Sequence, residues 1–381
     1  MIDTVTLKII KNNFQILKEN KLDGLRKHKV QNRFEISSQY CKKYRDQKKR
    51  EGQYFPVITV QKGRDSNNDE LNSLEIQVSL PKLIYGTNLY EIDLSDLDLI
   101  YQKLLNNLLE IGIKTDKSSL QTATIKRIDF SKVIRLPAEL GTANQAIKKI
   151  SEFDIKQSSK VSLKEYSKED QKIKGISFKF LNTTQGYAIY SKFGEILANG
   201  YTEMEKMIIQ KINLEDFKDN AIRFEFSLQQ KKSVNAELKK FIHYKKQDFY
   251  LYDVIKDQNI ARQILLNVFD KIFQPQYINL LSLSEMNNNL LEQKLNSQNL
   301  SIINHSLLHY LAERTTKIGV SATFEELKAK LKGSSFDRYK KKLKNLLLNL
   351  DKIENPTYNL IQFLRKEHND FKLIKLVLPK K

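Results

Sequence analysis

Three stretches of this sequence alternate polar and apolar residues, and each carries two chemically active side chains two residues apart. The pairs are Arg127 and Asp129, Tyr190 and Lys192, and Arg223 and Glu225. Residues i and i+2 of a β-strand point to the same face, so each pair shares one face and its apolar neighbours occupy the other. If the three strands lie in one sheet, the polar face gathers two carboxylates, three cations and a phenol. The pattern therefore predicts a sheet with one chemically active face.

The stretch from Gly186 to Phe193 is the most informative of the three. A tyrosine nucleophile in phosphoryl transfer needs a nearby cation that stabilises the phenolate and the charge on the phosphate. Tyr190 and Lys192 meet that need if the stretch is a strand, because Tyr187 then points to the opposite, apolar face. A helix would instead place Tyr187 and Tyr190 on one face as two alternating nucleophiles. The alternative without chemistry is a set of half-solvated strands that carry ordinary surface ion pairs.

The charge balance indicates a polyanionic partner, and nucleic acid is the leading candidate. The chain has 65 Lys and Arg against 45 Asp and Glu, a formal net charge of +20. Residues 26–50 alone hold ten Lys and Arg against Glu35 and Asp46, with Tyr40 and Tyr44 between them. Such a segment can follow a phosphate backbone while its aromatic rings stack on bases. A solvated charged surface, or the lysine-rich composition of an AT-rich genome, would give similar numbers.

Composition argues against several other classes of protein. Cys41 is the single cysteine, which excludes an intrachain disulfide framework and a four-cysteine zinc site. The sequence contains no run of about 18 apolar residues, so it predicts no transmembrane helix. The first residues lack the basic region of a signal peptide. We therefore expect a reducing compartment and no membrane partner.

Hydrophobic spacing divides the chain into an alternating part and a helical part. The predicted strands cover residues 4–9, 56–60, 74–80 and 176–180 beside the three above, and the predicted helices cover residues 95–112 and 142–153. The polar residues 156–174 predict a loop or a frayed insertion, and the Asn-, Gln- and Leu-rich residues 287–299 predict a hinge. The expected fold class is α+β, with an antiparallel sheet and helices packed on one of its faces over residues 1–235. A mostly α-helical domain, residues 236–381, is expected to follow.

A predicted helix-turn-helix lies near the end of the sequence. Thr323 and Glu326 have the spacing of a capping box that opens a helix through Leu331, and residues 336–350 form a second helix after a turn. The second helix carries the basic residues Arg338, Lys340, Lys341, Lys342 and Lys344. These residues are candidates for DNA contact. An ordinary amphipathic helical hairpin has a similar composition.

Six short motifs follow one another in a recognisable order. They are Leu74–Lys82, Tyr85–Asn88, Arg127–Asp129, Ala188–Lys192, Arg223–Glu225 and, more weakly, Ser335–Tyr339. In this succession and spacing the chain resembles the gene II replication initiators of filamentous phages and related plasmid replication proteins. The resemblance covers most of the chain, although each motif is short.

The resemblance implies an endonuclease that starts rolling-circle replication by nicking one strand at a specific origin. Such an enzyme forms a 5′-phosphotyrosine, leaves a 3′-hydroxyl as primer, and later rejoins the ends as a strand transferase. By resemblance Tyr190 stands at the position of the nucleophile. Lys192, Arg127 and Arg223 are then expected to stabilise the charge on the phosphate.

The resemblance also places Asp129 and Glu225 at acidic positions, which we assign to a divalent metal, and Glu75 is the candidate for a third ligand. Oxygen ligands favour Mg²⁺ or Mn²⁺ over zinc. The chain departs from a relative that has histidine where Thr87 stands. It also lacks the paired His-hydrophobic-His motif of many rolling-circle nucleases, since its five histidines are scattered.

The partners that the resemblance implies are double-stranded and single-stranded origin DNA, a host helicase and a polymerase, in the cytoplasm of a bacterial host. Two other functions fit part of the sequence. A non-catalytic initiator of a theta-replicating plasmid would bind DNA without needing Tyr190. A basic RNA-binding protein would use exposed aromatic residues for stacking, and Tyr190 would be one of several.

Overall fold

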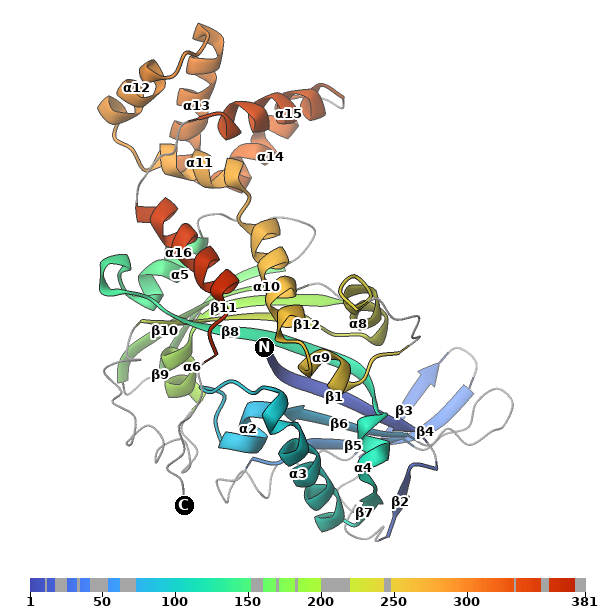
Figure 1. The fold of residues 1–381 in the computed structure, drawn as a ribbon. Coiled ribbons are helices and arrows are strands. Elements are labelled where there is room, and N and C mark those ends of the chain that lie inside the picture. The colour runs from blue at the N-terminus through green and yellow to red at the C-terminus, as the bar shows by residue number, and fades with distance from the viewer. Residues whose placement is uncertain are drawn as a thin grey trace.

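A computed structural model gives the fold of the chain (Figure 1). The residues that it describes are 1–10, 12–17, 26–32, 35–41, 54–61, 73–151, 160–168, 171–181, 184–199, 220–242, 248–331, 334–350 and 356–373. A long antiparallel sheet runs across the molecule, and a group of helices lies beyond one side of it (Figure 1). No helix among the described residues is both long and apolar enough to cross a lipid bilayer.

The sheet has eight strands in the order β5-β6-β1-β8-β12-β11-β10-β9, and every neighbouring pair is antiparallel. The strands are β1 Ile2–Ile10, β5 Val57–Gln61, β6 Ser73–Ser79, β8 Thr124–Arg135, β9 Lys160–Lys168, β10 Gln171–Leu181, β11 Gln185–Ser191 and β12 Ala221–Leu228. The three strands with the predicted polar pairs, β8, β12 and β11, are consecutive neighbours in the middle of this order. The predicted α+β class with an antiparallel sheet is thus confirmed.

Two smaller sheets and several helices surround the large sheet. The small strands β2 Phe14–Ile16 and β7 Ile113–Thr115 pair, as do β3 Arg26–Asn32 and β4 Glu35–Cys41. The helices of this part are α2 Leu80–Tyr85, α3 Leu97–Glu110, α4 Lys117–Gln121, α5 Ala143–Ser151, α6 Lys192–Asn199, α8 Lys231–Leu238 and α9 Leu251–Ile255. The amphipathic helix α3 forms as its spacing predicts, because Leu97, Ile100, Leu104 and Leu108 recur every three or four residues and are all buried.

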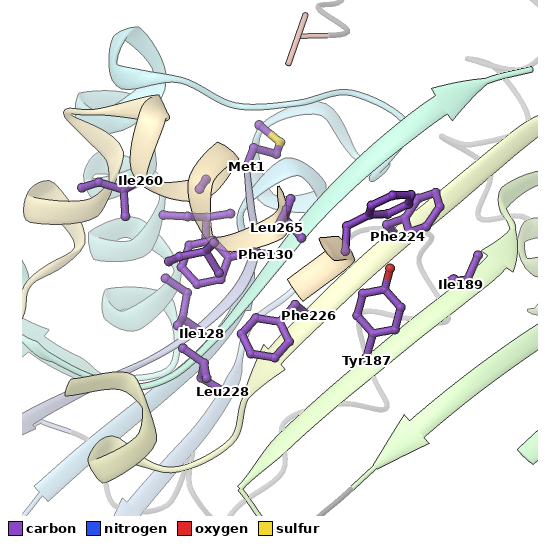
Figure 2. Close-up of a cluster of buried hydrophobic side chains, with 14 of the residues drawn as sticks. Met1, Ile128, Phe130, Tyr187, Ile189, Phe224, Phe226, Leu228, Ile260 and Leu265 are labelled. Atoms are coloured by element: carbon purple, nitrogen blue, oxygen red, sulfur yellow. The ribbon is translucent and has the colours of Figure 1, made fainter. Parts of the chain in front are cut away.

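The apolar face of the central strands is covered by helices from late in the chain. Tyr187 and Phe224 lie together on this face with Phe130, Phe226 and other buried side chains (Figure 2). Helices α10 Gln258–Ile272 and α16 Pro356–Asp370 pack on it, and both contact β8. Each large aromatic ring buries about 150–250 Å², so this layer supplies much of the burial that holds the sheet and the two helices together.

Two irregularities interrupt the pairing of β1 with β8. Ile2 pairs with Phe130 and Thr4 pairs with Asp129, so Asp3 is an extra residue on β1. A second register shift, farther along the two strands, makes Lys126 an extra residue on β8. A bulge breaks the strict alternation and redirects a side chain. Asp3 and Lys126 therefore reach the polar face although their positions do not follow the period-2 pattern.

The helices α11 Pro275–Ser284, α12 Asn288–Ser297, α13 Ile302–Ile318, α14 Val320–Lys330 and α15 Ser334–Leu348 form a separate group. Helix α11 contacts α13, α14 and α15, and α12 packs on α13. Helices α10 and α16 run from this group to the sheet (Figure 1). Packing therefore groups α10 and α16 with the sheet, and the boundary at residue 235 stays a prediction about independently folding domains.

The predicted loop over residues 156–174 is wrong where the structure describes it. Strands β9 and β10 occupy residues 160–168 and 171–181. Strand β9 is at the edge of the sheet. Edge strands carry charged residues as a rule, so their alternation of polar and apolar residues is weak.

The predicted hinge over residues 287–299 is also wrong, because α12 occupies most of it. Asn287 caps this helix by accepting a hydrogen bond from the backbone N–H of Leu290 at 2.9 Å. Leu291 and Leu295, one turn apart, are buried. Three leucines in ten residues, one of them the exposed Leu290, give too weak a periodicity to recognise, although Asn is among the preferred N-cap residues.

The first helix of the predicted helix-turn-helix begins earlier than its capping-box spacing indicates. Helix α14 begins at Val320, directly after Gly319, which has a φ of 81° and ends α13. Thr323 therefore lies inside α14, where its hydroxyl donates to the carbonyl of Gly319 at 2.8 Å. A threonine within a helix commonly bonds back in this way. The second helix, α15, is close to the predicted range.

Candidate active site

Strand register places the reactive side chains on one face of β8, β12 and β11. Arg223 on β12 is directly opposite Tyr190 on β11, and Glu225 on β12 is directly opposite Ser131 on β8. Residues paired in this way have Cβ atoms about 4.5–5.5 Å apart. The phenol, the guanidinium and the carboxylate are therefore immediate neighbours, as the alternation of the three strands predicts.

Glu225 anchors the hydroxyl group of Tyr190. The phenolic O–H donates to Glu225 Oε1 at 2.5 Å, and the same oxygen accepts a hydrogen bond from Arg223 Nε at 2.7 Å. Tyr190 is 7% exposed. Burial, followed by the charge of Glu225, raises the pKa of Tyr190 well above its ordinary value. The phenol is therefore protonated at neutral pH, and Glu225 is the group in place to accept its proton.

Arg223 is the buried cation at the centre of the polar face. Its guanidinium donates to the backbone oxygen of Asn88 at 2.6 Å and to Ser131 Oγ at 3.0 Å. It also forms an ion pair with Asp3 Oδ1 at 2.9 Å, in addition to its bond with Glu225. A buried guanidinium that satisfies its donors in this way holds two carboxylates from two different strands together.

Lys192 lies at the site, but it belongs to a helix and not to the predicted strand. Strand β11 ends at Ser191, and Lys192 is the first residue of α6 rather than a strand residue. Its buried ammonium donates to Asn88 Oδ1 at 2.7 Å and pairs with Glu195 Oε2 at 2.6 Å. The nitrogen lies 5.9 Å from the centre of the Tyr190 ring. Burial lowers the pKa of Lys192, and the charge of Glu195 opposes that effect.

Asp129 and Arg127 form the outer part of the same face. Arg127 donates to the two oxygens of Asp129 at 3.1 and 2.8 Å. Burial raises the pKa of Asp129, and the hydrogen bond and charge of Arg127 oppose that rise. The side chain of Arg127 is 36% exposed, so this guanidinium can still meet a phosphate from solution.

Glu75 does not join this group. It pairs with Lys126 at 2.6 Å. It is opposite Lys8 of β1, whereas Asp129 is opposite Thr4, four residues away along the same strand. At about 3.4 Å per residue, four residues separate the two carboxylates by roughly 14 Å along the strands. Asp3, which the bulge turns toward Arg223, is the third acid of the face.

Tyr187 lies on the other face of β11, as the strand prediction requires. It belongs to the apolar core and its ring centre is 6.3 Å from that of Phe224. Figure 2 shows Tyr187 among the apolar side chains of this core. Its buried hydroxyl has no hydrogen-bond partner among the residues that the structure describes. The two tyrosines therefore do not share a face.

The acidic side chains of the polar face suit a hard divalent cation in their chemistry. Asp3, Asp129 and Glu225 offer only carboxylate oxygens, the ligands that Mg²⁺ and Mn²⁺ prefer. Within the described ranges, no three His, Cys, Asp or Glu side chains already stand close enough to hold a metal ion. Arg127 and Arg223 occupy these carboxylates instead. The donor set fits such a cation, whereas the arrangement of the side chains is that of ion pairs.

Thr87 and the three histidines with described side chains contribute no ligand to this face. His305 and His309 are on α13, and His368 of α16 lies against Phe224 on the apolar face. Thr87 is fully buried, and its hydroxyl accepts the backbone N–H of Leu89 at 3.3 Å. The remaining histidines fall where no side chain is described.

The predicted DNA-binding helix presents its basic side chains to solvent. Leu343 and Leu347 of α15 are buried, and α15 packs on α11. The exposed side chains of α15 include all five of its basic residues, Arg338, Lys340, Lys341, Lys342 and Lys344. None of them forms an ion pair with another residue in the described part of the chain. The basic segment 42–50, by contrast, lies outside the described residues.

Asp3, Asn88 and Glu195 are site residues that the pattern of alternating strands did not reveal. Asp3 lies in a bulge, and Asn88 lies in the loop after α2. Glu195 lies in the first turn of α6. The available signals were the motif Tyr85–Asn88, which contains Asn88, and the i, i+3 spacing of Lys192 and Glu195, which is a helical ion-pair spacing.

Comparison with known proteins gives one family. Residues 1–247 match the family named Phage CRI, which is described as the N-terminal region of a replication-associated protein. No curated protein sequence matches the chain. Among solved structures, the chain is similar to the rolling circle replication initiator protein from Geobacillus stearothermophilus, with 11% identity over 64% of this chain and 79% of that one. The TM-score of that similarity is 0.29, which is too low to support an inference.

Proposed function

Because the chain belongs to the Phage CRI family of replication-associated proteins, we propose that it initiates rolling-circle DNA replication as a site-specific nickase. It cuts one strand at an origin, stays joined to the 5′ end through a tyrosine, and leaves a 3′-hydroxyl that primes synthesis. The observation that carries this proposal is the hydrogen bond from the buried Tyr190 to Glu225, with Arg223 and Lys192 beside it.

The nicking step uses Tyr190 as the nucleophile and Glu225 as the acceptor of its proton. As the phenolic oxygen attacks the phosphorus, its proton passes to Glu225 Oε1, which already accepts that O–H bond. The bond between phosphorus and the 3′-oxygen breaks, the leaving oxygen takes up a proton from water to become the 3′-hydroxyl, and Glu225 returns the tyrosine proton to water. The 5′-phosphotyrosine retains the energy of the phosphodiester bond, so a 3′-hydroxyl can attack it and rejoin the ends.

The cations of the face stabilise the charge that develops on the phosphate. Lys192 and Arg223 are buried next to Tyr190, where water screens them little. Arg127 is partly exposed at the outer edge of the face and is suited to the first contact with the DNA backbone. The three cations therefore bind and orient the phosphate in line with the tyrosine.

Asp129 and Glu225 are the side chains that would hold Mg²⁺ or Mn²⁺, with Asp3 in place of Glu75 as the third acid. When bound, such a cation would polarise the scissile phosphate and offset its charge. Arg127 would then be free to turn from Asp129 toward the DNA.

Helix α15 would anchor the protein on double-stranded origin DNA. Its five basic side chains are exposed and unpaired within the described residues, and an α-helix fits the major groove or follows phosphates along it. The polar face of the sheet would then act on the DNA strand that becomes single-stranded. A host helicase and polymerase in a bacterial cytoplasm would extend the 3′ end, as in the replication mode proposed.

The test is one incubation of the full chain with Mg²⁺ and supercoiled DNA that carries its replicon's origin. We expect nicked circles with protein covalently bound to the 5′ end. Tyr190→Phe should bind the DNA and form no adduct. Binding without nicking by the unaltered protein would instead favour a non-catalytic initiator, and a preference for RNA would favour an RNA-binding protein.

A further inference from the structure

Asn88 bonds to both of the buried cations beside Tyr190. Its side-chain Oδ1 accepts a hydrogen bond from Lys192 Nζ at 2.7 Å, and its backbone oxygen accepts one from Arg223 Nη1 at 2.6 Å. All three residues are buried, with Asn88 itself 8% exposed. Asn88 thus connects the start of α6 with the middle of β12.

The loop that carries Asn88 is held at several points. Gly86 ends α2 with a φ of 74°, and its N–H bonds to the carbonyl of Lys82 at 3.0 Å. Lys103 of α3 donates to the last carbonyls of α2 at 2.9 and 3.2 Å. Thr87 is fully buried and forms a local turn with Leu89. Both hydrogen-bonding groups of Asn88 are therefore presented by a fixed backbone.

Lys192 depends on this loop for its position. A buried ammonium needs hydrogen-bond partners for its donors, and among the described residues Lys192 has two, Asn88 and Glu195. Glu195 is on the same helix, so it cannot fix where α6 and Lys192 sit relative to Tyr190. Asn88 comes from a separate part of the chain and can. Without the side chain of Asn88, the ammonium of Lys192 would be positioned by Glu195 alone.

We propose that Asn88 is a positioning residue that holds Lys192, and through its backbone oxygen Arg223, where both can meet the phosphate attacked by Tyr190. This inference rests on the proposed function. The two bonds come from different atoms of Asn88. Asn88→Ala therefore removes the bond to Lys192 and retains the carbonyl that binds Arg223. This variant tests the bond between Asn88 and Lys192 by itself.

The test is a double-mutant cycle on the rate of adduct formation with a single-stranded origin oligonucleotide, measured in single turnovers. We expect Asn88→Ala to slow the reaction about tenfold or more, the size expected when a hydrogen bond to a charged group is removed. In a Lys192→Met background, Asn88→Ala should cause no further slowing. Asn88→Asp should restore much of the rate, because its carboxylate also accepts from Lys192. Equal slowing by Asn88→Ala with and without Lys192 would overturn the inference.

Thr87→Val is the matched control, since Thr87 is buried in the same loop and does not contact Lys192. Any slowing that it causes should be the same in both backgrounds. A second cycle, on stability in urea at neutral pH, needs no activity and should show the same coupling between Asn88 and Lys192. If the unaltered protein forms no adduct, the proposed function fails, and with it the role of Asn88 in positioning cations for that reaction. If it forms one and the cycles are additive, only the role of Asn88 fails.

Discussion

The two faces of the central sheet each bury a tyrosine from the same strand, and they give the two rings different chemistry. Tyr187 packs in the apolar core near Phe224, and its hydroxyl has no partner in the described part of the structure. Tyr190, three residues later, donates to Glu225 beside Arg223. Burial is similar, so what differs is the set of side chains that each face receives from its neighbours.

The contrast teaches what each face contributes. The apolar face buries aromatic rings of β12, α10 and α16, and its contribution is stability. The polar face buries Arg223 between Asp3 and Glu225. Ion pairs of this kind cost about as much in desolvation as they return, so they are weak evidence for stability. The polar face is therefore expected to govern the reaction, and the apolar face to govern folding.

The largest effect should come from the acids of the polar face. Glu225→Gln and Asp129→Asn should each lower Mg²⁺-dependent nicking by at least about 100-fold, because Glu225 is proposed to take the tyrosine proton and both acids are proposed to hold the cation. Binding to duplex DNA should change little. Nicking of supercoiled origin DNA is the measurement. Glu75→Gln is the matched control, as Glu75 is on the same face but far along the strands. Full nicking by both site variants would refute their assignment.

A large side chain removed from the apolar face should show the opposite profile. Phe269→Ala, on α10, should lower the free energy of unfolding by about 3–5 kcal/mol, because Phe269 is fully buried against Phe224 and His368. Urea unfolding measures this change. The nicking rate of the folded fraction should stay within a few-fold of the unaltered rate. A decrease in nicking as large as that of Glu225→Gln, without unfolding, would break the division between the faces.

Acid should weaken the apolar face through His368. Burial lowers the pKa of His368 from 6.5 to about 4, so the unfolded chain binds a proton that the folded chain does not. Stability is therefore highest above pH 6.5 and falls as the pH drops toward 4. Between pH 7 and 5 the decrease should be about 2 kcal/mol. His368→Phe should reduce this pH dependence, whereas Phe269→Leu, which removes no titrating group, should leave its slope unchanged. An unchanged slope in His368→Phe would show that His368 is not the group responsible.

The smallest effect should come from α15, which belongs to neither face. Replacing Lys340, Lys341 and Lys344 by Gln should reduce the slope of log affinity against log salt by about 0.9 for each phosphate that the helix no longer neutralises. The rate of adduct formation on a single-stranded oligonucleotide should not change. Replacing three exposed lysines outside α15, Lys232, Lys239 and Lys271, by Gln provides the control for net charge. If the slope of log affinity against log salt stays the same in the α15 variant, this helix does not contact the DNA.

Alternation was sufficient to predict the strands that build the site and the opposite orientation of the two tyrosines. It works there because one face of β12 is fully apolar and the middle of β11 adds Tyr187 and Ile189 to it, which makes the period of two clear. The basic helix α15 was also visible, because its buried leucines and exposed lysines follow helical spacing.

The parts that sequence did not predict are those fixed by residues distant in the chain. Asp3 reaches Arg223 through a bulge that depends on the pairing of β1 with β8. Lys192 reaches the site from a helix because the chain turns at Ser191, and Asn88 meets it from a loop about a hundred residues earlier. In the edge strand β9 the alternation of Val161 and Leu163 ends at Glu165, so the apolar pattern was too short to reveal the strand. None of these has a local pattern, since each depends on tertiary pairing.

The identity of the tyrosine that carries the DNA tests the central claim most directly. Digestion of the covalent protein–DNA adduct and peptide mapping by mass spectrometry would locate the nucleotide on the fragment that spans β11. We predict that it lies on Tyr190 alone, and that Tyr187→Phe, which removes only an unpartnered hydroxyl, still forms the adduct with unchanged or slightly higher stability. A nucleotide on Tyr187, or on both tyrosines in comparable yield, would contradict the assignment of chemistry to the polar face.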